Sequence, residues 1–497
     1  MRELPDLDLS SADMARAHSK IRIAPVVALA ALALCAGSSS AAPGGRRPSS
    51  APIVKQLTIT VPDGTRLTCG LVVPAGRAPA GGWPGLVLFH ALGSSHLAMQ
   101  AIAAKYFAPS GLASLACDAR GTGGSGGAFD LDGPVETQDT RYLFNGFASL
   151  SVVSNTKIGA FGWSLGGGGV WNAAVAGVPF KALAVGASWT NLAQALMPHG
   201  VPKNGRVERL ARGIRASSWD PASLRALTDL STGHVSPATN AAAALRSARA
   251  KLGSLDIPTL ILQGRHDFLF DLGQAVASYG LLPGKKALYI GDFGHSPAKN
   301  PPAEQPFYYH EVAGWFAHYL AGGPPVPGGV ALARDPWNGS AVRFKSLPAT
   351  RTLSFRLPGK NKLVAARFVS RSVRLPDRSL QTFGSGWVIV HYAGAVGWTD
   401  RLVATVSLQG AAIPITEGAA PITAAGGSLR IPLLDEAVPL TRGKKLVVTI
   451  GTSSRNGEYR GTIPRDGINA PKPGGGRPIT IGRIDLKLPV LKPVSGG

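Results

Sequence analysis

The sequence has few cysteines, few charged residues and no apolar run long enough to cross a membrane, and each shortage excludes a class of protein. Only three of its 497 residues are cysteines, which excludes a disulfide-dense small domain. Their spacing matches no zinc or thioredoxin pattern. The apolar run from Ile23 to Cys35 is too short for a transmembrane span, and none follows it. A hydrophobic content of 45% with 16% charged residues excludes an intrinsically disordered chain.

Acidic residues are scarce: 28 Asp and Glu stand against 51 Lys and Arg, a net charge of +23. The excess is concentrated in residues 341–497, where 23 basic and 8 acidic residues leave a net charge of +15. A field of this sign attracts anionic partners. No tight basic run or aromatic-interleaved basic stripe occurs, so we predict no specific nucleic-acid binding. Attachment to an anionic cell-envelope polymer and a merely soluble basic surface both stay open.

The N-terminal residues are typical of an export signal. A basic segment beginning at Met14 precedes the apolar run, and small residues at 38–42 offer cleavage sites. We predict a signal peptide over residues 1–42, with Met14 as an alternative start, and a linker over 43–52. The protein would then be secreted or associated with the cell envelope. Lipid anchoring at Cys35 is the weaker alternative, because the leucine before it fits the lipoprotein pattern poorly.

The alternation of apolar and helical segments predicts two folded domains with an insertion. Eight apolar runs between residues 53 and 321 alternate with helical stretches, which is typical of a mostly parallel, eight-stranded α/β sheet covered on both faces. Residues 191–252 interrupt this pattern and read as a helical cap, so the α/β domain comprises 53–190 and 253–321. The Gly- and Pro-rich residues 322–340 read as a linker. Residues 341–497 show short alternating strands and no clear helix, which indicates a β-sandwich.

Ser164 lies in the glycine-rich stretch GAFGWSLGGGG, residues 159–169, directly after an apolar segment. Three structures compete for this stretch: a phosphate-binding loop, a flexible linker and a strained turn that presents a nucleophile. No Lys-Ser/Thr follows the glycines, as a phosphate loop requires, and apolar segments on both sides argue against a linker. The pattern G-x-S-x-G at 162–166 is typical of a nucleophile elbow. The three further glycines, 167–169, exceed what an elbow needs, and we attribute them to close packing of the following helix on the sheet.

A serine nucleophile needs a base and an orienting acid. In this architecture the chain order is Ser, Asp or Glu, then His, each at the carboxyl end of a strand. Asp267 follows the apolar run 259–263, and His295 follows the run 287–290. We therefore predict a Ser164–Asp267–His295 triad, with Asp271 as the alternative acid.

The backbone N–H groups of Leu165 and Ala91 are the predicted oxyanion hole, since one follows the nucleophile and the other follows the third strand. His90 is expected to be a structural turn residue. Trp163 and Trp189 are candidate walls of the substrate pocket, although core aromatics are the simpler interpretation. The mechanism needs no metal or organic cofactor, and the oligomeric state cannot be read from the sequence.

Residues 118–127, DARGTGGSGG, follow another apolar run and form a polar turn in which Arg120 is expected to bind a buried carboxylate. Together with the serine motif and the triad order, this D-x-R-G-x-G-x-S-x-G string resembles the α/β-hydrolase superfamily, and within it the X-prolyl dipeptidyl aminopeptidase and cocaine esterase-like family. The resemblance implies an α/β-hydrolase core, a helical cap before the acid-bearing strand and a C-terminal jelly-roll domain.

One departure from that family affects the expected substrate. Its members commonly place a tyrosine after the third strand, whereas this chain has His90-Ala91-Leu92-Gly93 there, more like ordinary lipases and esterases. We therefore predict a secreted serine hydrolase that cleaves small-molecule esters. The alternatives are a peptidase of the X-prolyl type acting on peptides and a hydrolase scaffold that mainly binds anionic envelope polymers.

The resemblance also brings two cysteines together. In this fold the second and fourth strands are neighbours, and Cys69 and Cys117 lie on them. A disulfide, which export would permit, and two buried free thiols are both compatible with that placement.

Overall fold

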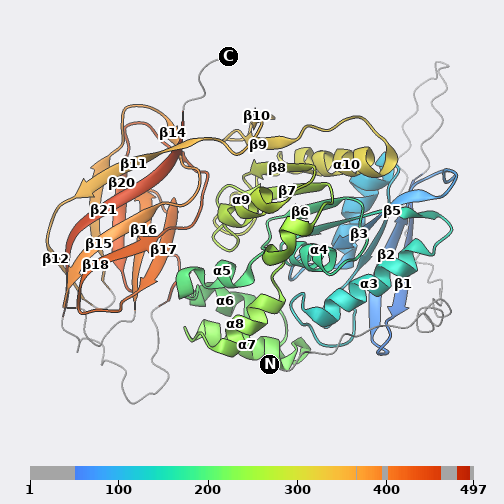
Figure 1. The fold of residues 1–497 in the computed structure, drawn as a ribbon, viewed down its shortest axis with the longest axis horizontal. Coiled ribbons are helices and arrows are strands. Elements are labelled where there is room, and N and C mark those ends of the chain that lie inside the picture. Colours follow the sequence, from blue (N-terminus) through green and yellow to red (C-terminus); the bar gives the residue numbers. More distant parts are fainter. Residues whose placement is uncertain (1–50, 365–366, 395–400, 461–477, 493–497) are drawn as a thin grey trace, which may run out of the picture.

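The computed structural model describes residues 51–364, 367–394, 401–460 and 478–492. The predicted signal peptide and most of the predicted 43–52 linker lie outside these residues. Figure 1 shows an α/β body, a group of helices along its lower edge and a β-only part beside both. None of the helices in these described segments is long and apolar enough to cross a membrane.

One mixed sheet of ten strands forms the body. The strand order is β1-β2-β4-β3-β5-β6-β7-β8-β9-β10. The strands from β4 to β9 in this order run parallel, whereas β2 is antiparallel to both of its neighbours and β10 is antiparallel to β9. Apolar, fully buried strands such as β7 suit the centre of a sheet covered on both faces. The strands are β1 Ile53–Thr60, β2 Arg66–Val73, β3 Trp83–Phe89, β4 Ala113–Cys117, β5 Val153–Trp163, β6 Leu183–Gly186, β7 Thr259–Gly264, β8 Lys286–Gly291, β9 Gly329–Ala333 and β10 Ala341–Phe344.

The predicted mostly parallel sheet is present, but the predicted count of eight strands is wrong by two. β9 lies in the predicted linker 322–340, and β10 lies at the predicted start of the β-sandwich. Both strands are short and follow Gly- and Pro-rich sequence, so no periodicity marks them. They form through tertiary pairing. β9 pairs with β8, with Val330 opposite Leu288, and β10 pairs with β9.

Helices cover both faces of this sheet. On one face α3 (Pro134–Ala148), α4 (Leu165–Val175) and α9 (Leu272–Leu281) share an apolar core with the strands. On the other face α2 (His96–Ile102) and α10 (Gln305–Ala321) share a second core. The predicted α/β class is therefore confirmed.

The predicted insertion is helical and lies against the carboxyl edge of the sheet. Two of its helices begin at side-chain caps: Asp220 accepts the N–H of Ser223, and Ser236 forms a capping box with Thr239. Its apolar side chains share a core with Leu165 and other residues of the body. The helices are α5 Leu192–Leu196, α6 Asn204–Ala211, α7 Pro221–Ser231 and α8 Pro237–Leu245, and the short helical turns in the chain are Ala103–Phe107, Ala108–Ser110, Pro198–Gly200, Ala216–Ser218 and Arg249–Ser254.

The C-terminal part consists of antiparallel sheets. A five-stranded sheet (β11, β12, β15, β18, β21) and a four-stranded sheet (β13, β16, β17, β20) share one apolar core, and β14 pairs with β19 separately. The predicted β-rich domain is thus present, whereas its jelly-roll connectivity stays a prediction. One predicted strand, 363–369, is instead divided between β12 and β13. The strands are β11 Thr350–Leu357, β12 Asn361–Leu363, β13 Val369–Arg374, β14 Leu380–Gln381, β15 Trp387–Ala393, β16 Arg401–Leu408, β17 Thr416–Pro421, β18 Gly426–Pro432, β19 Pro439–Leu440, β20 Lys445–Gly451 and β21 Ile479–Leu491.

A disulfide joins Cys69 and Cys117 across the first part of the body. β2 and β4 are adjacent and antiparallel, and their register places the two cysteines directly opposite each other with Cα atoms 4.0 Å apart. Of the two states that the sequence left open, the structure has the bridged one.

Candidate active site

Ser164 occupies the sharp turn between β5 and α4. Its backbone has φ 54° and ψ −115°, outside the regions that side-chain-bearing residues normally adopt. Two hydrogen bonds maintain this conformation: the Ser164 N–H donates to the carbonyl of Gly186 at 2.8 Å, and the Ser188 hydroxyl donates to the carbonyl of Ser164 at 2.7 Å. A sharp strand-to-helix turn with a positive φ at the serine is the geometry that the elbow motif predicts.

The two glycines of the motif are required by space. A Cβ at Gly162 would lie 2.2 Å from the carbonyl oxygen of Gly166, and a Cβ at Gly166 would lie 2.3 Å from the carbonyl oxygen of Phe89. Both contacts are with backbone atoms, which cannot move aside as a flexible side chain can. Larger residues would therefore open the turn.

The three further glycines bring α4 close to its neighbours, as we predicted. A Cβ at Gly167 would lie 2.5 Å from the Cβ of Ser188, and a Cβ at Gly168 would lie 2.4 Å from the Trp189 ring. At Gly169 the nearest atom is a carboxylate oxygen of Asp132, 3.1 Å away. The first two positions are therefore sterically closed to larger residues, and the third is tight but not closed.

The predicted triad residues come together at the carboxyl ends of three strands. Ser164 follows β5, Asp267 follows β7 and His295 follows β8. Ser164 Oγ lies 2.7 Å from His295 Nε2, and His295 Nδ1 lies 2.8 Å from Asp267 Oδ2. The alternative acid, Asp271, lies at the start of α9, and no hydrogen bond joins it to His295 in the described chain.

The acid is buried and held by backbone donors. Asp267 is 0% exposed, and its Oδ1 accepts the N–H groups of Leu269 and Phe270 at 2.9 and 3.1 Å. Burial alone would raise the pKa of Asp267, but the charge of His295 and the hydrogen bonds to the carboxylate outweigh burial and lower that pKa. The carboxylate therefore remains ionised and orients the Nδ1–H of His295.

A small apolar cavity lies beside Ser164, between the body and the helical insertion. Ser164 and Trp189 both line it, and the Trp189 ring is fixed by a hydrogen bond from Nε1 to the carbonyl of Arg246 and by contact with Phe270. Every other lining side chain is apolar: Leu92, Leu131, Leu165, Leu192, Leu196, Leu210, Trp219, Leu227, Leu269 and Phe270.

Trp163, the other predicted pocket wall, lies elsewhere. Its ring packs edge-on against Phe293 and Tyr308 in the core on the opposite face of the sheet. Side chains of successive strand residues alternate in direction, so a residue that precedes the nucleophile points away from the site. The prediction for Trp163 is therefore wrong, and the core interpretation applies.

The predicted oxyanion donors lie just after two neighbouring strands, β5 and β3. Leu165 is the first residue of α4, where a helix leaves its N–H groups without partners, and Ala91 follows β3. Within the described segments neither N–H donates to a backbone acceptor in a turn or loop. His90 is structural, as expected: its Nε2 accepts the N–H of Ala119 at 3.0 Å, and burial lowers its pKa.

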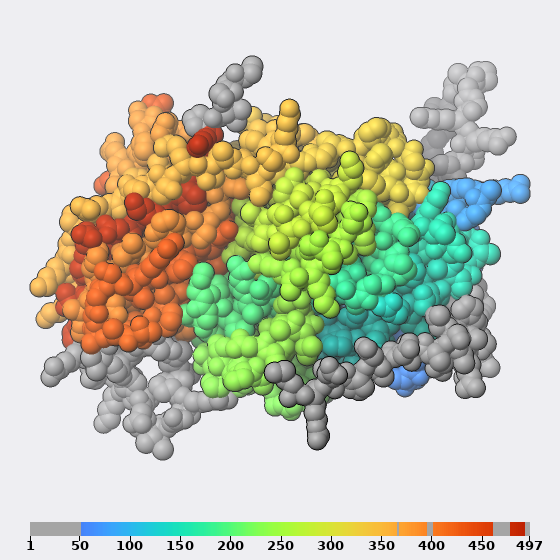
Figure 2. Space-filling model, viewed as in Figure 1, coloured from blue at the N-terminus to red at the C-terminus, as the bar shows by residue number. Residues whose placement is uncertain are grey.

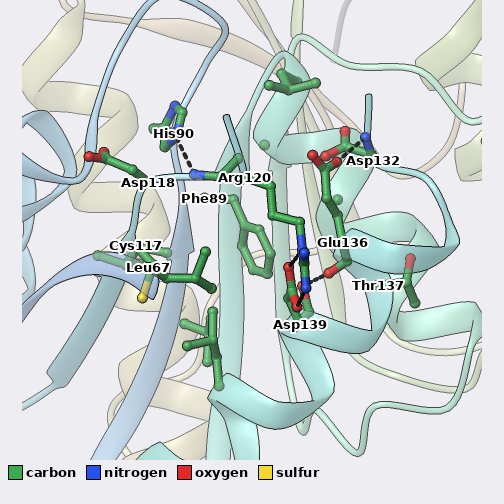
Figure 3. A pocket seen from close by; sticks show the side chains of 18 residues that line it. Leu67, Phe89, His90, Cys117, Asp118, Arg120, Asp132, Glu136, Thr137 and Asp139 are labelled. Carbon is green, nitrogen blue, oxygen red and sulfur yellow. Dashed lines mark hydrogen bonds and ion pairs between the residues drawn. The ribbon is translucent and has the colours of Figure 1, made fainter. Parts of the chain in front are cut away.

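A second cavity lies behind the elbow, and Figure 3 shows its charged lining. Arg120 forms ion pairs with Asp139 and Asp63, which confirms the prediction that it binds a buried carboxylate. Glu136 accepts the N–H of Asp130 at 3.0 Å and that of Asp132, and burial raises the pKa of Glu136 to about 8. Ser164 does not line this cavity, so we assign these groups to holding the loop after β4 rather than to chemistry.

Sequence reasoning missed two basic residues beside the triad, Lys203 and Arg206. Arg206 in α6 forms an ion pair with Glu458 of the C-terminal part and donates to the carbonyl of Ser296, next to His295. Lys203 is fully buried against the loop of Asp267. Figure 2 shows the helical insertion in direct contact with the C-terminal part. No sequence signal marks either residue, because their partners lie far along the chain.

Comparisons with known proteins agree with this architecture. Residues 63–297 match the model of the X-Pro dipeptidyl-peptidase (S15) family. A CocE/NonD family hydrolase from Staphylococcus aureus has the same fold, with 12% identity, a TM-score of 0.65, and 88% of this chain and 94% of that chain covered. An aminopeptidase from a marine sediment archaeon, Thaumarchaeota archaeon, gives 13% identity, a TM-score of 0.64 and coverage of 92% and 99%.

An α-amino acid ester hydrolase is similar as well, with 13% identity, a TM-score of 0.60 and coverage of 90% of this chain and 97% of that chain. No curated protein matches the chain in sequence. The resemblance inferred from the sequence motifs is confirmed. The match of residues 63–297 to the X-Pro dipeptidyl-peptidase (S15) family and the α/β-hydrolase-like fold together indicate a serine-type hydrolase.

Proposed function

We propose that the protein is an esterase that cleaves esters of uncharged, apolar acids through an acyl-enzyme on Ser164. The observation that carries this proposal is the continuous contact from Ser164 Oγ through His295 to buried Asp267 beside an apolar cavity. A hydroxyl in contact with an oriented imidazole is the arrangement that nucleophilic acyl transfer needs.

The proposed reaction has two steps, formation of the acyl-enzyme and its hydrolysis, and His295 moves a proton in both. Ser164 Oγ attacks the ester carbonyl carbon while His295 Nε2 takes the hydroxyl proton. The N–H groups of Leu165 and Ala91 stabilise the oxyanion. His295 then gives the proton to the leaving alcohol, which departs as the acyl-enzyme forms. Water attacks the acyl-enzyme with His295 again as base, releasing the acid, and Asp267 stays ionised throughout.

The cavity lining favours an ester over an X-prolyl peptide. A dipeptidyl substrate carries an ammonium group close to the bond that is cleaved, and a buried ammonium needs a counter-charge. None of the described residues that line the cavity beside Ser164 is charged. Burial of an apolar acyl chain against leucines and Trp189 needs no such partner. The family match keeps X-prolyl peptidase activity as the second candidate.

A fluorophosphonate probe tests the nucleophile. We expect labelling of the wild-type protein, loss of labelling in Ser164→Ala, and a fall in esterase kcat on the order of 10⁶-fold. Ser149→Ala is the control, because Ser149 is exposed at the end of α3 and its hydroxyl donates to the carbonyl of Gly146, so this variant should still be labelled. Labelling that survives Ser164→Ala would refute the assignment. Nitrophenyl esters of graded acyl length, assayed beside X-Pro amides, decide between the two candidates.

Export and attachment to the cell envelope are further parts of the proposal. The N-terminal signal pattern and the Cys69–Cys117 disulfide both suit an oxidising compartment. The net charge of +15 in residues 341–497 suits an anionic envelope polymer. Retention of the full chain on such a polymer should weaken steeply as salt is added, and salt-insensitive retention would count against the charge-based interaction.

A further inference from the structure

Lys203 is a buried lysine directed at the loop that carries the catalytic acid. It lies immediately before α6 and is 0% exposed. Its Nζ donates to the carbonyl oxygens of Phe268 and Leu269 at 2.8 and 3.1 Å. Its own backbone is fixed, because its N–H donates to the carbonyl of Leu196 and its carbonyl accepts the N–H groups of Arg206 and Val207.

The two peptide units whose carbonyl groups accept from Lys203 also donate their N–H groups to Asp267. The carbonyl of Phe268 and the N–H of Leu269 belong to one peptide unit, and the carbonyl of Leu269 and the N–H of Phe270 belong to the next. In a trans peptide the two groups point in opposite directions. Lys203 therefore bonds to the carbonyl side of both units, and Asp267 Oδ1 accepts the N–H on the other side of each.

We propose that Lys203 is the positioning residue of the catalytic acid: through these two peptide units it fixes and polarises the donors that hold Asp267 toward His295. The proposal rests on the proposed function, since it assigns a role within that triad. Hydrogen bonds in series strengthen one another, and they do so most where water is excluded, as it is here. The ammonium acts on the carboxylate through the backbone and needs no direct contact with it.

The cost of burying this lysine supports a specific role. Burial lowers the pKa of Lys203, because an ammonium is poorly accommodated away from water. An apolar side chain would fill the same space without that penalty. Other charged groups also interact with Lys203 and with Asp267, and the pH dependence of activity includes their contributions. Those that act on Lys203 are Arg206, Asp267, Asp271, Glu417, Glu436 and Glu458, and those that act on Asp267 are His266, His295, Asp271 and Glu436.

The same turn of the insertion also reaches the loop of the catalytic base. Arg206, three residues after Lys203, donates to the carbonyl of Ser296 at 2.8 Å. Its guanidinium is bound by Glu458 of the C-terminal part, with Nε 2.7 Å from Oε2. A Cβ at Gly205 would lie 1.9 Å from the carbonyl oxygen of Gly457, so this turn is packed directly on the C-terminal loop. The insertion thus contacts both triad loops from a single, well-fixed helical turn.

Two variants separate the hydrogen bonds of Lys203 from its charge. Lys203→Gln keeps an N–H donor without charge, and Lys203→Met keeps the length without either. Arg209→Met is the matched control: Arg209 lies in the same helix and pairs with Glu458, but it bonds to neither triad loop. The measurements are kcat, KM and the pH profile of kcat/KM for a nitrophenyl ester, with thermal unfolding to verify folding and Ser164→Ala as the inactive reference.

We expect Lys203→Met to lower kcat by roughly 10- to 100-fold, less than the ~10⁴-fold loss typical of removing the charge of a triad acid. KM should change by less than about threefold, because the side chain does not line the cavity. In both variants the acid limb of kcat/KM should move to higher pH by about half a unit, since loss of a cation lets the Asp267–His295 pair hold its proton more tightly. Lys203→Gln should retain more of kcat than Lys203→Met. Arg209→Met should match the wild type in all three measurements.

Several results would overturn the proposal. Folded Lys203 variants with the wild-type kcat and an unmoved acid limb would show that the lysine does not act on the triad. A change in KM alone would assign Lys203 to pocket shape, and failure of both variants to fold would assign it to stability only. A wild-type protein that hydrolyses no ester and resists the fluorophosphonate would instead refute the proposed function, which distinguishes the two failures.

Discussion

Replacing Gly168 by alanine tests whether the glycine run after the nucleophile serves close packing. The new Cβ would lie 2.4 Å from the Trp189 ring and 2.7 Å from an Asp132 carboxylate oxygen. The ring cannot yield easily, because its Nε1 bonds to the carbonyl of Arg246 and it packs on Phe270. Overpacking of this kind costs about 1–3 kcal/mol, whereas Gly to Ala in a helix gains about 1 kcal/mol. The net effect is a destabilisation of about 1 kcal/mol.

Gly169→Ala is the matched control within the same helix. Its Cβ would meet Asp132 Oδ1 at 3.1 Å and the Phe89 ring at 3.2 Å, so neighbours must shift by only a few tenths of an ångström. The gain in helix propensity, about 1 kcal/mol, should then dominate. Gly169→Ala is therefore expected to be more stable than Gly168→Ala by about 1–3 kcal/mol.

Urea unfolding, monitored by tryptophan fluorescence, measures the difference in stability between the two variants. KM for nitrophenyl esters of increasing acyl length reports on the shape of the cavity. Displacement of Trp189 by Gly168→Ala should raise KM for the longest acyl chains and leave that for acetate nearly unchanged. Equal stability of the two variants would refute the packing argument. So would a Gly168→Ala protein that is more stable than the wild type, because helix propensity alone would then explain the site.

Three further predictions follow from the same structure. The double variant Cys69→Ala/Cys117→Ala should lose about 4 kcal/mol of unfolding free energy in urea, because the disulfide closes a loop of 48 residues; a loss below about 1 kcal/mol would contradict this. Asp267→Asn should lower esterase kcat by about 10⁴-fold at unchanged folding, and a loss under tenfold would remove Asp267 from the triad. Burial raises the pKa of Glu417 to about 8 in the folded protein, whereas the ordinary pKa of a glutamate is near 4.5. Between these two pH values the folded protein keeps a proton on Glu417 that the unfolded chain has released. This contribution to stability is complete at low pH and is lost as the pH rises through about 8, so Glu417→Gln should flatten the fall in unfolding free energy between pH 5 and 8; parallel curves for the two proteins would show that Glu417 does not titrate in this range.

Much of the site could be predicted because its signals are local. A strand followed by G-x-S-x-G specifies the turn at Ser164, and the positions of Asp267 and His295 after two later strands place them at the same edge of the sheet. Trp163 was misassigned because a tryptophan next to the nucleophile suggests a pocket wall, whereas strand alternation turns it to the other face. The first eight strands were recognisable from apolar runs, but β9 depends on pairing with β8, β10 depends on pairing with β9, and neither carries a pattern of its own.

By itself, the sequence determined the fold class, the placement of Ser164, Asp267 and His295 at strand ends, and the use of glycine around Ser164. Each depends on residues that are close along the chain or on the strand ends of one regular sheet. Tertiary structure alone decided three other features. The disulfide depends on β2 and β4 meeting in register. The apolar cavity beside Ser164 depends on how the helical insertion packs on the body. The bond from Lys203 to Phe268 spans 65 residues and forms only because the insertion is packed against both the acid loop and the C-terminal strands. Contacts between residues that lie far apart along the chain produce no hydrophobic periodicity. The sequence around Lys203 therefore does not show which distant loop the lysine contacts.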